Sequence, residues 1–125
     1  MAKIKLLKFP IADGYKHIHQ FISKFDDCTV LIVYISEIGY CRCTIYDNCL
    51  ISLYISELSI NKHFRLTGQG SLLLQYIIDL CKINNIQIVS LNVKNDSWMK
   101  NWYKTYNFIE YEMLNDNYIT LIKTI

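Results

Sequence analysis

The chain has 125 residues, of which 52% are hydrophobic and 19% are charged, so it suits one folded domain over residues 1–125 and is not a disordered chain. The 13 Lys and Arg residues against 11 Asp and Glu leave a net charge of +2, too little for the strongly basic face of a dedicated nucleic-acid-binding protein. The longest apolar run covers about residues 28–35, far short of the roughly 20 residues that a membrane-spanning helix needs.

The N-terminus and the cysteines bear on the cellular compartment. Lysines alternate with apolar residues over residues 1–8, without the apolar stretch and cleavage site of a secretory signal. Together with an odd number of cysteines, this pattern favours reduced thiols and a cytoplasmic protein. Cys41 and Cys43 are two apart on a predicted strand, so their sulfurs face one side. No further ligand cluster accompanies them, and we interpret them as small buried residues rather than metal ligands.

The N-terminal half is predicted to contain four strands and one helix. Charged and apolar residues alternate over residues 3–9, which favours a strand. Asp13 can cap a helix over residues 13–25, where five apolar residues recur at helical spacing. Residues 29–36 and 40–46 are predicted as the two strands of a hairpin. Residues 50–60 are predicted as one long strand, or as two pieces with a bend.

The C-terminal half is predicted to contain two helices and three strands. The apolar spacing over residues 71–82 indicates an amphipathic helix. Residues 86–93 are almost continuously apolar, which is typical of a central or parallel strand. Residues 98–106 carry aromatic residues four apart and favour a short helix. Residues 108–113 and 118–125 are predicted to form a closing hairpin.

The order of these elements determines the fold class. The strand–helix–strand unit around residues 71–82 requires a parallel pair in the middle of the sheet, whereas the hairpins are antiparallel. The sequence therefore predicts an α/β (α+β) domain, in which helices flank a mixed, mostly antiparallel sheet with a central parallel pair.

The segment between the long strand and the following helix has the composition of a phosphate-binding loop. Two glycines spaced two apart let the backbone turn sharply and approach a bulky ligand. The first turn of a helix presents unpaired N–H groups at the positive end of its dipole, and an arginine before it adds a fixed charge. A pyrophosphate is the natural occupant, although spacing alone leaves open a plain strand-to-helix turn, because neither common nucleotide-binding glycine pattern is present. The residues are Arg65, Leu66, Thr67, Gly68, Gln69, Gly70 and Ser71.

Three stretches together resemble one family. Arg65-x-x-Gly68-x-Gly70 resembles the [QR]-x-x-G-x-[GA] signature of the GNAT superfamily of acyl-CoA-dependent N-acetyltransferases. The strand before it reads E-L-S-I over residues 57–60, similar to the family's E-L-x-V. Residues 102–108 read W-Y-K-T-Y-N-F and resemble its F-Y-x-x-x-G-F. The separations and the element order agree with the family from about residue 29 onward.

The sequence departs from the family pattern at several points. Lys62 and Leu66 stand where the family usually has proline and glycine. Asn107 replaces a glycine, but asparagine tolerates the left-handed conformation that such a turn needs. Between the first two strands the family has two helices, where the acceptor usually binds, and only the helix over residues 13–25 is predicted here.

The resemblance implies acetyl-CoA as co-substrate, an amine as the second partner, and no metal. The pyrophosphate would lie on the N–H groups of residues 66–71, and pantetheine would pair like a strand with Leu58, Ser59 and Ile60, beside residues 91–93. A backbone N–H near Leu58 would polarise the thioester carbonyl. The acceptor amine would attack directly in a ternary complex, and CoA thiolate would leave. A homodimer is compatible with this family resemblance.

Four side chains are candidates for further roles in such a site. Glu57, the only carboxylate in residues 50–60, is the candidate base, because an amine of pKa ~10.4 is mostly protonated at neutral pH. Tyr103 is the candidate acid for the leaving thiolate. Asn92 and Asn95, at the end of the central strand, could hydrogen-bond pantetheine or the acceptor. The alternatives are a solvent-facing carboxylate, a packing tyrosine, and ordinary turn or cap asparagines.

Strand alternation predicts where Glu57 points. Leu58 and Ile60 are expected to face the core, with Glu57 and Ser59 on the opposite face, unless a local bulge changes the facing. The leading hypothesis is an acetyl-CoA-dependent N-acetyltransferase. A catalytically inactive acyl-CoA-binding sensor or scaffold, and a phosphate-binding domain without acyl chemistry, stay open as alternatives. The acceptor is also open among polyamines, amino acids, aminoglycosides, peptide N-termini and protein lysines.

Overall fold

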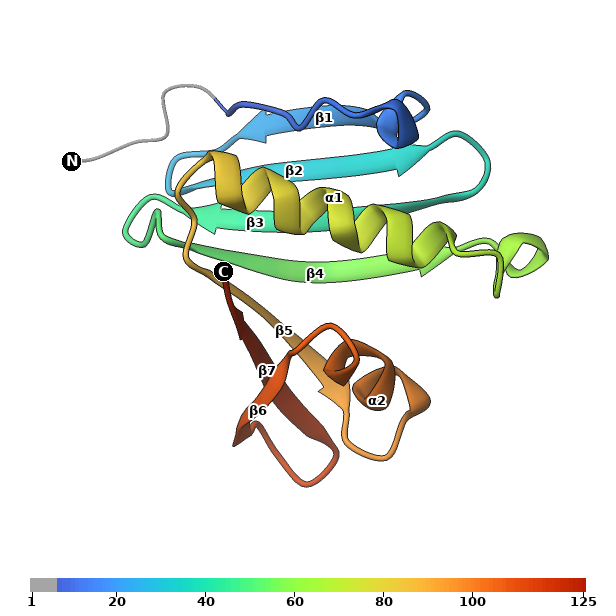
Figure 1. Ribbon diagram of the computed structural model, residues 1–125. Helices are drawn as coiled ribbons and strands as arrows, with labels where there is room; N and C mark the ends of the chain where they lie inside the picture. Colours follow the sequence, from blue (N-terminus) through green and yellow to red (C-terminus); the bar gives the residue numbers. More distant parts are fainter. Residues whose placement is uncertain (1–6) are drawn as a thin grey trace.

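The computed structural model describes residues 7–125, in which a seven-stranded sheet is accompanied by two α-helices (Figure 1). The strand order is β1-β2-β3-β4-β5-β7-β6, and every neighbouring pair is antiparallel except β4 and β5. This arrangement confirms the predicted mixed, mostly antiparallel sheet with a central parallel pair. The strands are β1 (His19–Lys24), β2 (Cys28–Ile35), β3 (Gly39–Tyr46), β4 (Ser52–Ile60), β5 (Ile88–Lys94), β6 (Ile109–Met113) and β7 (Tyr118–Thr124).

The start of the chain differs from the sequence prediction. The helix predicted over residues 13–25 is wrong, because a single 3₁₀ turn, η1 (Asp13–Tyr15), is followed by β1. β1 pairs with β2 along its whole length, so the sheet supplies backbone hydrogen bonds that a helix would otherwise provide. Three of the five residues of the expected apolar stripe are also exposed, with Phe21 at 60%. The strand predicted over residues 3–9 lies partly outside the described residues, and residues 7–9 form no strand.

The remaining elements lie within two residues of their predicted bounds. α1 (Gln69–Ile83) follows a second 3₁₀ turn, η2 (Lys62–Phe64), and α2 (Trp98–Lys104) follows β5. The strands predicted in the hairpins appear as β2 with β3 and β6 with β7. These elements were predictable because their apolar residues repeat at the period of the structure that they form.

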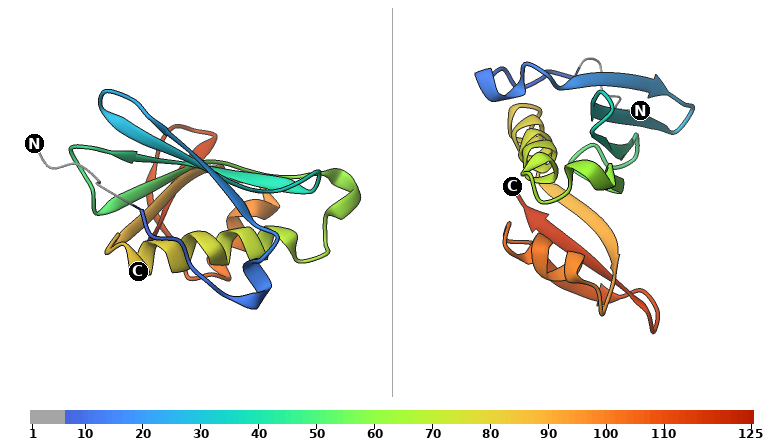
Figure 2. Two further views of the ribbon diagram at one scale, coloured as in Figure 1. Left: turned by 90° about the horizontal axis from the view of Figure 1, so that it is seen from above. Right: turned by 90° about the vertical axis from the view of Figure 1, so that its right-hand side faces the viewer.

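Both α-helices pack on the same face of the sheet (Figure 2). α1 lies on β3 and β4, α2 lies on β5, and the Tyr106 hydroxyl just after α2 donates a hydrogen bond to Ser71 in α1. No α-helix in residues 7–125 covers the opposite face, which we call the open face. Its outward side chains on β1 to β4 include His19, Phe21, Ile32, Tyr34, Tyr40, Arg42, Glu57 and Ser59.

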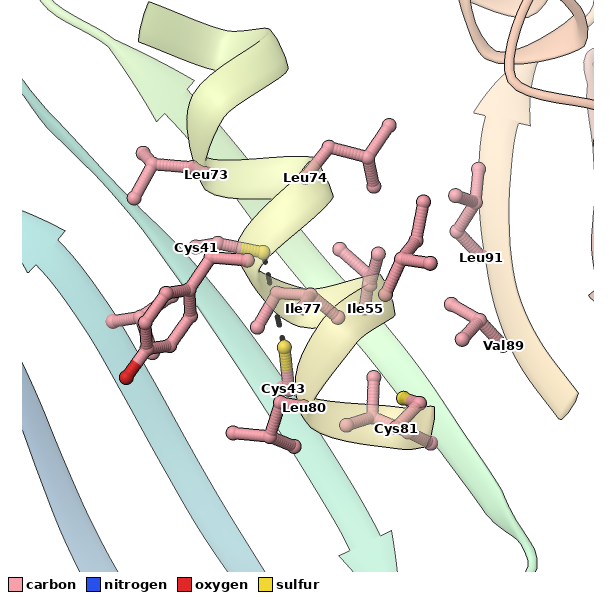
Figure 3. Close-up of a cluster of buried hydrophobic side chains, with 14 of the residues drawn as sticks. Cys41, Cys43, Ile55, Leu73, Leu74, Ile77, Leu80, Cys81, Val89 and Leu91 are labelled. Atoms are coloured by element: carbon pink, nitrogen blue, oxygen red, sulfur yellow. Dashed lines mark hydrogen bonds between the residues drawn. The ribbon is translucent and has the colours of Figure 1, made fainter. Parts of the chain in front are cut away.

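The core lies between α1 and the sheet (Figure 3). Cys41 and Cys43 are fully buried there, with their sulfur atoms 3.7 Å apart, as the prediction of small buried residues requires. Burial raises the pKa of the Cys43 thiol well above its usual value and that of Cys81 to about 12. Within the described residues, no group of three metal-ligating side chains is arranged around a common point. None of their helices has the length and apolar composition needed to cross a membrane.

Candidate active site

The two halves of β4 have different neighbours. The first half pairs in parallel with β5, and this pairing ends at Ile55 opposite Leu91. Beyond that point β5 turns away, whereas β4 continues to Ile60 with β3 as its strand partner (Figure 1). The backbone of Leu58, Ser59 and Ile60 therefore has no β5 ladder on one side. This opening is where the resemblance places the pantetheine arm.

A β-bulge at Ser56 separates these two halves. Ile55 pairs with Cys43 and Glu57 pairs with Arg42, so Ser56 is the extra residue on β4. Leu58 and Ile60 pack against the core, whereas Glu57 lies on the open face with Arg42. The prediction that Leu58 and Ile60 face the core and Glu57 the opposite side is therefore confirmed. The extra residue at Ser56 causes this facing, because it reverses the alternation set by the first half of β4.

The bulge left a signal in the sequence that a close reading could have found. Leu53 and Ile55 are core residues at odd positions, whereas Leu58 and Ile60 face the core at even positions. Strict alternation cannot place all four on one face, so an extra residue must lie between Ile55 and Leu58.

Arg42 of β3 contacts the Glu57 carboxylate, and Tyr40 of the same strand lies near it. Arg42 Nη2 lies 3.5 Å from Glu57 Oε1, and Arg42 Nε donates a hydrogen bond of 3.1 Å to Ser56 Oγ. Ser56 Oγ in turn donates to the Arg42 carbonyl at 3.0 Å, so Arg42 also fastens the bulge. The nearby Glu57 carboxylate is the main cause that raises the pKa of Tyr40. Sequence reasoning missed Tyr40 and Arg42, because their proximity to Glu57 depends on the β3–β4 register.

The loop before α1 has the conformation of a helix start open to a ligand. Gly68 is the N-cap, with φ of 84°, and the first hydrogen bond of the helix runs from the Leu72 N–H to the Gly68 carbonyl at 3.0 Å. The N–H groups of Gln69, Gly70 and Ser71 precede that bond and belong to the unpaired first turn. Thr67 faces the preceding turn, where its hydroxyl donates to the Phe64 carbonyl.

Gly70 and Leu66 have roles that the motif alone did not reveal. Gly70 is helical rather than left-handed, and an added Cβ would lie 3.7 Å from both Ile60 and Trp102. The missing side chain therefore keeps space between the end of β4 and α2. Leu66 has φ of 65°, the left-handed conformation that suits the glycine usual at this point of the family signature. Arg65 Nε donates to the Ile60 carbonyl at 3.2 Å, which places its charge at the end of β4.

Tyr103 is almost completely buried on the helix side of the opening. Its ring makes edge contacts with Trp102 and Phe108, with ring centroids 4.9 and 5.3 Å away. Burial is the main cause that raises the pKa of Tyr103, and the nearby thiols of Cys41 and Cys43 add to it. The Cys41 thiol is near Tyr103, and Cys41 is the β3 partner of Leu58. Tyr103 therefore lies on the helix side of the part of β4 that is expected to hold the thioester.

The two asparagines are engaged within the protein. Asn92 Nδ2 donates to the Tyr54 hydroxyl at 3.2 Å, and its Oδ1 accepts from Thr120 at 2.7 Å. Asn95 Oδ1 accepts from Lys100 Nζ at 2.9 Å. A role for Asn92 in holding pantetheine would require its two bonds to be exchanged, and a role for either asparagine stays a prediction.

Sequence and structure comparisons assign the chain to a family. The model of the acetyltransferase (GNAT) family matches residues 5–108, and the chain belongs to that family. No curated protein sequence matches the chain. Ard1 from Thermoplasma volcanium has a similar fold, with a TM-score of 0.65 and 22% identity over 77% of this chain and 70% of that one.

Two further solved structures show the same fold. An acetyltransferase from Bacillus cereus gives a TM-score of 0.64 and 20% identity over 92% of this chain and 80% of its own. The PaiA N-acetyltransferase of Thermoplasma acidophilum, solved in complex with coenzyme A, gives 0.63 and 17% identity over 79% and 62%.

Proposed function

We propose that this protein transfers an acetyl group from acetyl-CoA to a primary amine in a ternary complex. The observation that carries the proposal is the opening of the sheet beyond the Ile55–Leu91 pair. The unpaired first turn of α1 lies at one end of this opening, and Glu57 faces the other side of the sheet. Family membership and the complex of PaiA with coenzyme A support the same conclusion.

The backbone supplies most of the groups that would hold acetyl-CoA. The N–H groups of residues 66–71, together with Arg65, fit a pyrophosphate at the start of α1. The free edge of Leu58, Ser59 and Ile60 fits the amide groups of a pantetheine arm. Bound acetyl-CoA would supply the acetyl group as a thioester.

Three groups of the chain would then act on the reacting atoms. The Leu58 N–H would stabilise negative charge on the thioester oxygen as the amine attacks. Glu57, on the open face, would accept a proton from the amine directly or through a water molecule. Tyr103 would act on the leaving sulfur from the helix side. A tyrosine is protonated at neutral pH, and because burial raises the pKa of Tyr103 further, it serves as a hydrogen-bond donor more readily than as a full proton donor.

An acyl-CoA-binding module without catalysis is the second candidate. The observation that favours it is the ion pair between Arg42 and Glu57, which engages the candidate base. Both side chains are more than two-fifths exposed, so solvent weakens this pair and an incoming amine can compete for the carboxylate. The two candidates share the loop before α1 and differ in whether CoA is released.

The test combines acetyl-CoA binding with CoA release. Gly70→Val would place methyl groups between Ile60 and Trp102, so calorimetry should show loss of acetyl-CoA binding, whereas Gly14→Val, at a glycine with nothing within 4 Å, should bind normally. Wild-type protein should release CoA when amines are added. Unchanged affinity in a folded Gly70→Val variant would remove the proposed loop site. Tight binding without transfer to any amine would favour the binding module.

A further inference from the structure

The open face carries a concavity of about 620 Å³ next to Glu57. It lies over the ends of β2 and β3 and the turn that joins them. Its lining includes Arg42, which contacts the Glu57 carboxylate, and Tyr40, which lies near that carboxylate. A molecule seated in the concavity would therefore reach the proposed base without crossing the sheet.

Strand register arranges the side chains around the concavity in two parallel rows. One row runs from Glu57 on β4 through Arg42 on β3 to Ile32 on β2, and the other from Ser59 through Tyr40 to Tyr34. Neighbouring strands are about 4.8 Å apart, so Ile32 lies about 10 Å from Glu57 across the sheet. That span matches an amine joined to a single ring or branched side chain.

The chemistry of the lining selects among amines. The apolar part of the lining is formed by the side chains of Ile32, Tyr34 and Ile38 and by the ring of Tyr40, and its uncharged polar side chains are Ser36, Ser59 and Asn61. Its charged residues are Glu37 and Arg42, whose charges are opposite. Beyond Glu57 the lining offers one carboxylate, Glu37, so the further ammonium groups of a polyamine or aminoglycoside would lie on apolar side chains or beside a guanidinium, and both are unfavourable.

From these rows and charges we infer that the acceptor is a primary monoamine with an apolar or aromatic body, either a free amine or the N-terminal residue of a peptide. The amine would lie at Glu57, and the apolar body over Ile32 and Tyr34. The inference rests on the proposed acetyl transfer and adds the acceptor class. In this protein, strands β2 and β3 supply the acceptor surface, because no α-helix in the described residues covers the open face.

The test compares four amines with wild-type protein and acetyl-CoA. 2-Phenylethylamine and an amidated tetrapeptide with N-terminal leucine represent the two sources of an apolar amine. Glycinamide lacks the apolar body, and spermidine is a polycation. At least one apolar amine should exceed glycinamide about tenfold or more in kcat/KM, the range typical of filling an apolar pocket, and spermidine should not. The preferred apolar amine identifies the source.

A matched pair of variants locates the effect. Ile32→Glu should lower kcat/KM for the preferred apolar amine about tenfold or more, whereas Val30→Glu, two residues away on the same face of β2 but outside the concavity, should not. Acetyl-CoA affinity and the thermal midpoint check that both variants are folded. Binding of 2-phenylethylamine to the CoA-loaded protein, followed by NMR at the Ile32 methyl groups, gives a readout that does not need catalysis.

The outcomes separate this inference from the proposed function. Acetyl transfer that prefers spermidine, or equal effects of Ile32→Glu and Val30→Glu, would overturn the acceptor class and leave the transfer intact. Binding at Ile32 without transfer to any amine would overturn the proposed transfer and support the apolar amine site. Neither transfer nor binding of any of the four amines would overturn both.

Discussion

The two faces of the sheet differ in how they would recognise a ligand. On the helix face, the groups that suit acetyl-CoA are mainly backbone N–H groups of one short loop and the free edge of β4. On the open face, the groups around Glu57 are side chains brought together from β2, β3 and β4. A loop that binds through its backbone leaves a short motif in the sequence, whereas a surface built across strands does not.

The bulge at Ser56 connects the two faces. It keeps Leu58 and Ile60 toward the core while Glu57 faces the open side, so the proposed acetyl-CoA site and the proposed acceptor site share this strand. The Arg42 side chain donates a hydrogen bond to Ser56 in the bulge and also contacts the Glu57 carboxylate. One side chain therefore contacts both the bulge and the candidate base. The following changes affect one face at a time.

The largest effect is expected on the open face, from Glu57→Gln. If Glu57 takes the proton of the amine, kcat/KM should fall about 10²–10⁴-fold with unchanged acetyl-CoA affinity. The loss should shrink as pH rises, because more of the amine is already neutral. The same change at Glu112, an exposed carboxylate on β6, should have no effect. A loss that does not vary with pH would indicate positioning, and no loss at all would remove Glu57 from the mechanism.

A smaller effect is expected on the helix face, from Tyr103→Phe. Only the hydroxyl is removed, so the ring contacts with Trp102 and Phe108 stay. If the phenol stabilises the leaving sulfur, kcat should fall about 10–100-fold, at or below the lower end of the general-acid range. Tyr76→Phe, another buried tyrosine, is the matched control in α1. Equal rates for Tyr103→Phe and wild type would leave Tyr103 with a packing role only.

The close approach of β3 to the end of β4 is tested by stability rather than by rate. A Cβ at Gly39 would lie 2.5 Å from the Ser59 carbonyl oxygen and 2.6 Å from an Ile60 methyl. Gly39→Ala should therefore lower the free energy of unfolding by about 1–3 kcal/mol, the usual cost of overpacking. Gly14→Ala meets nothing within 4 Å and should be close to neutral. Urea unfolding measures both, and equal stability of the two variants would contradict the close approach of β3 to β4.

The smallest effect concerns pH and the thiols beneath α1. The pKa of Cys81 is about 12 in the fold against an ordinary value of 9.0. Because the unfolded chain loses this proton first, the contribution of the neutral thiol to the free energy of unfolding is complete below pH 9 and is lost as pH rises toward 12. The thermal midpoint should fall between pH 8 and pH 10, and the fall should be shallower in Cys81→Ala. Cys49→Ala, at an exposed cysteine, should keep the wild-type slope. A pH-independent midpoint in wild type would contradict the buried thiol.

The parts that sequence reasoning predicted are those with a local cause. α1 and the loop before it follow from apolar spacing and from the glycines, and β2 to β7 follow from their composition and turns. The helix predicted over residues 13–25 failed because pairing with β2 outweighed a helical pattern of apolar residues. Tyr40 and Arg42 were out of reach, because only the register of β3 on β4 brings them to Glu57.

The most direct test of the central claim is an NMR titration of the amide groups with CoA. The account predicts that signals of residues 66–71 and of Leu58, Ser59 and Ile60 shift together, while the amides of Ile32 and Tyr34 on the open face stay unchanged. Shifts centred on Ile32 and Tyr34, with none in the loop before α1, would contradict the division of the two faces between acetyl-CoA and the acceptor.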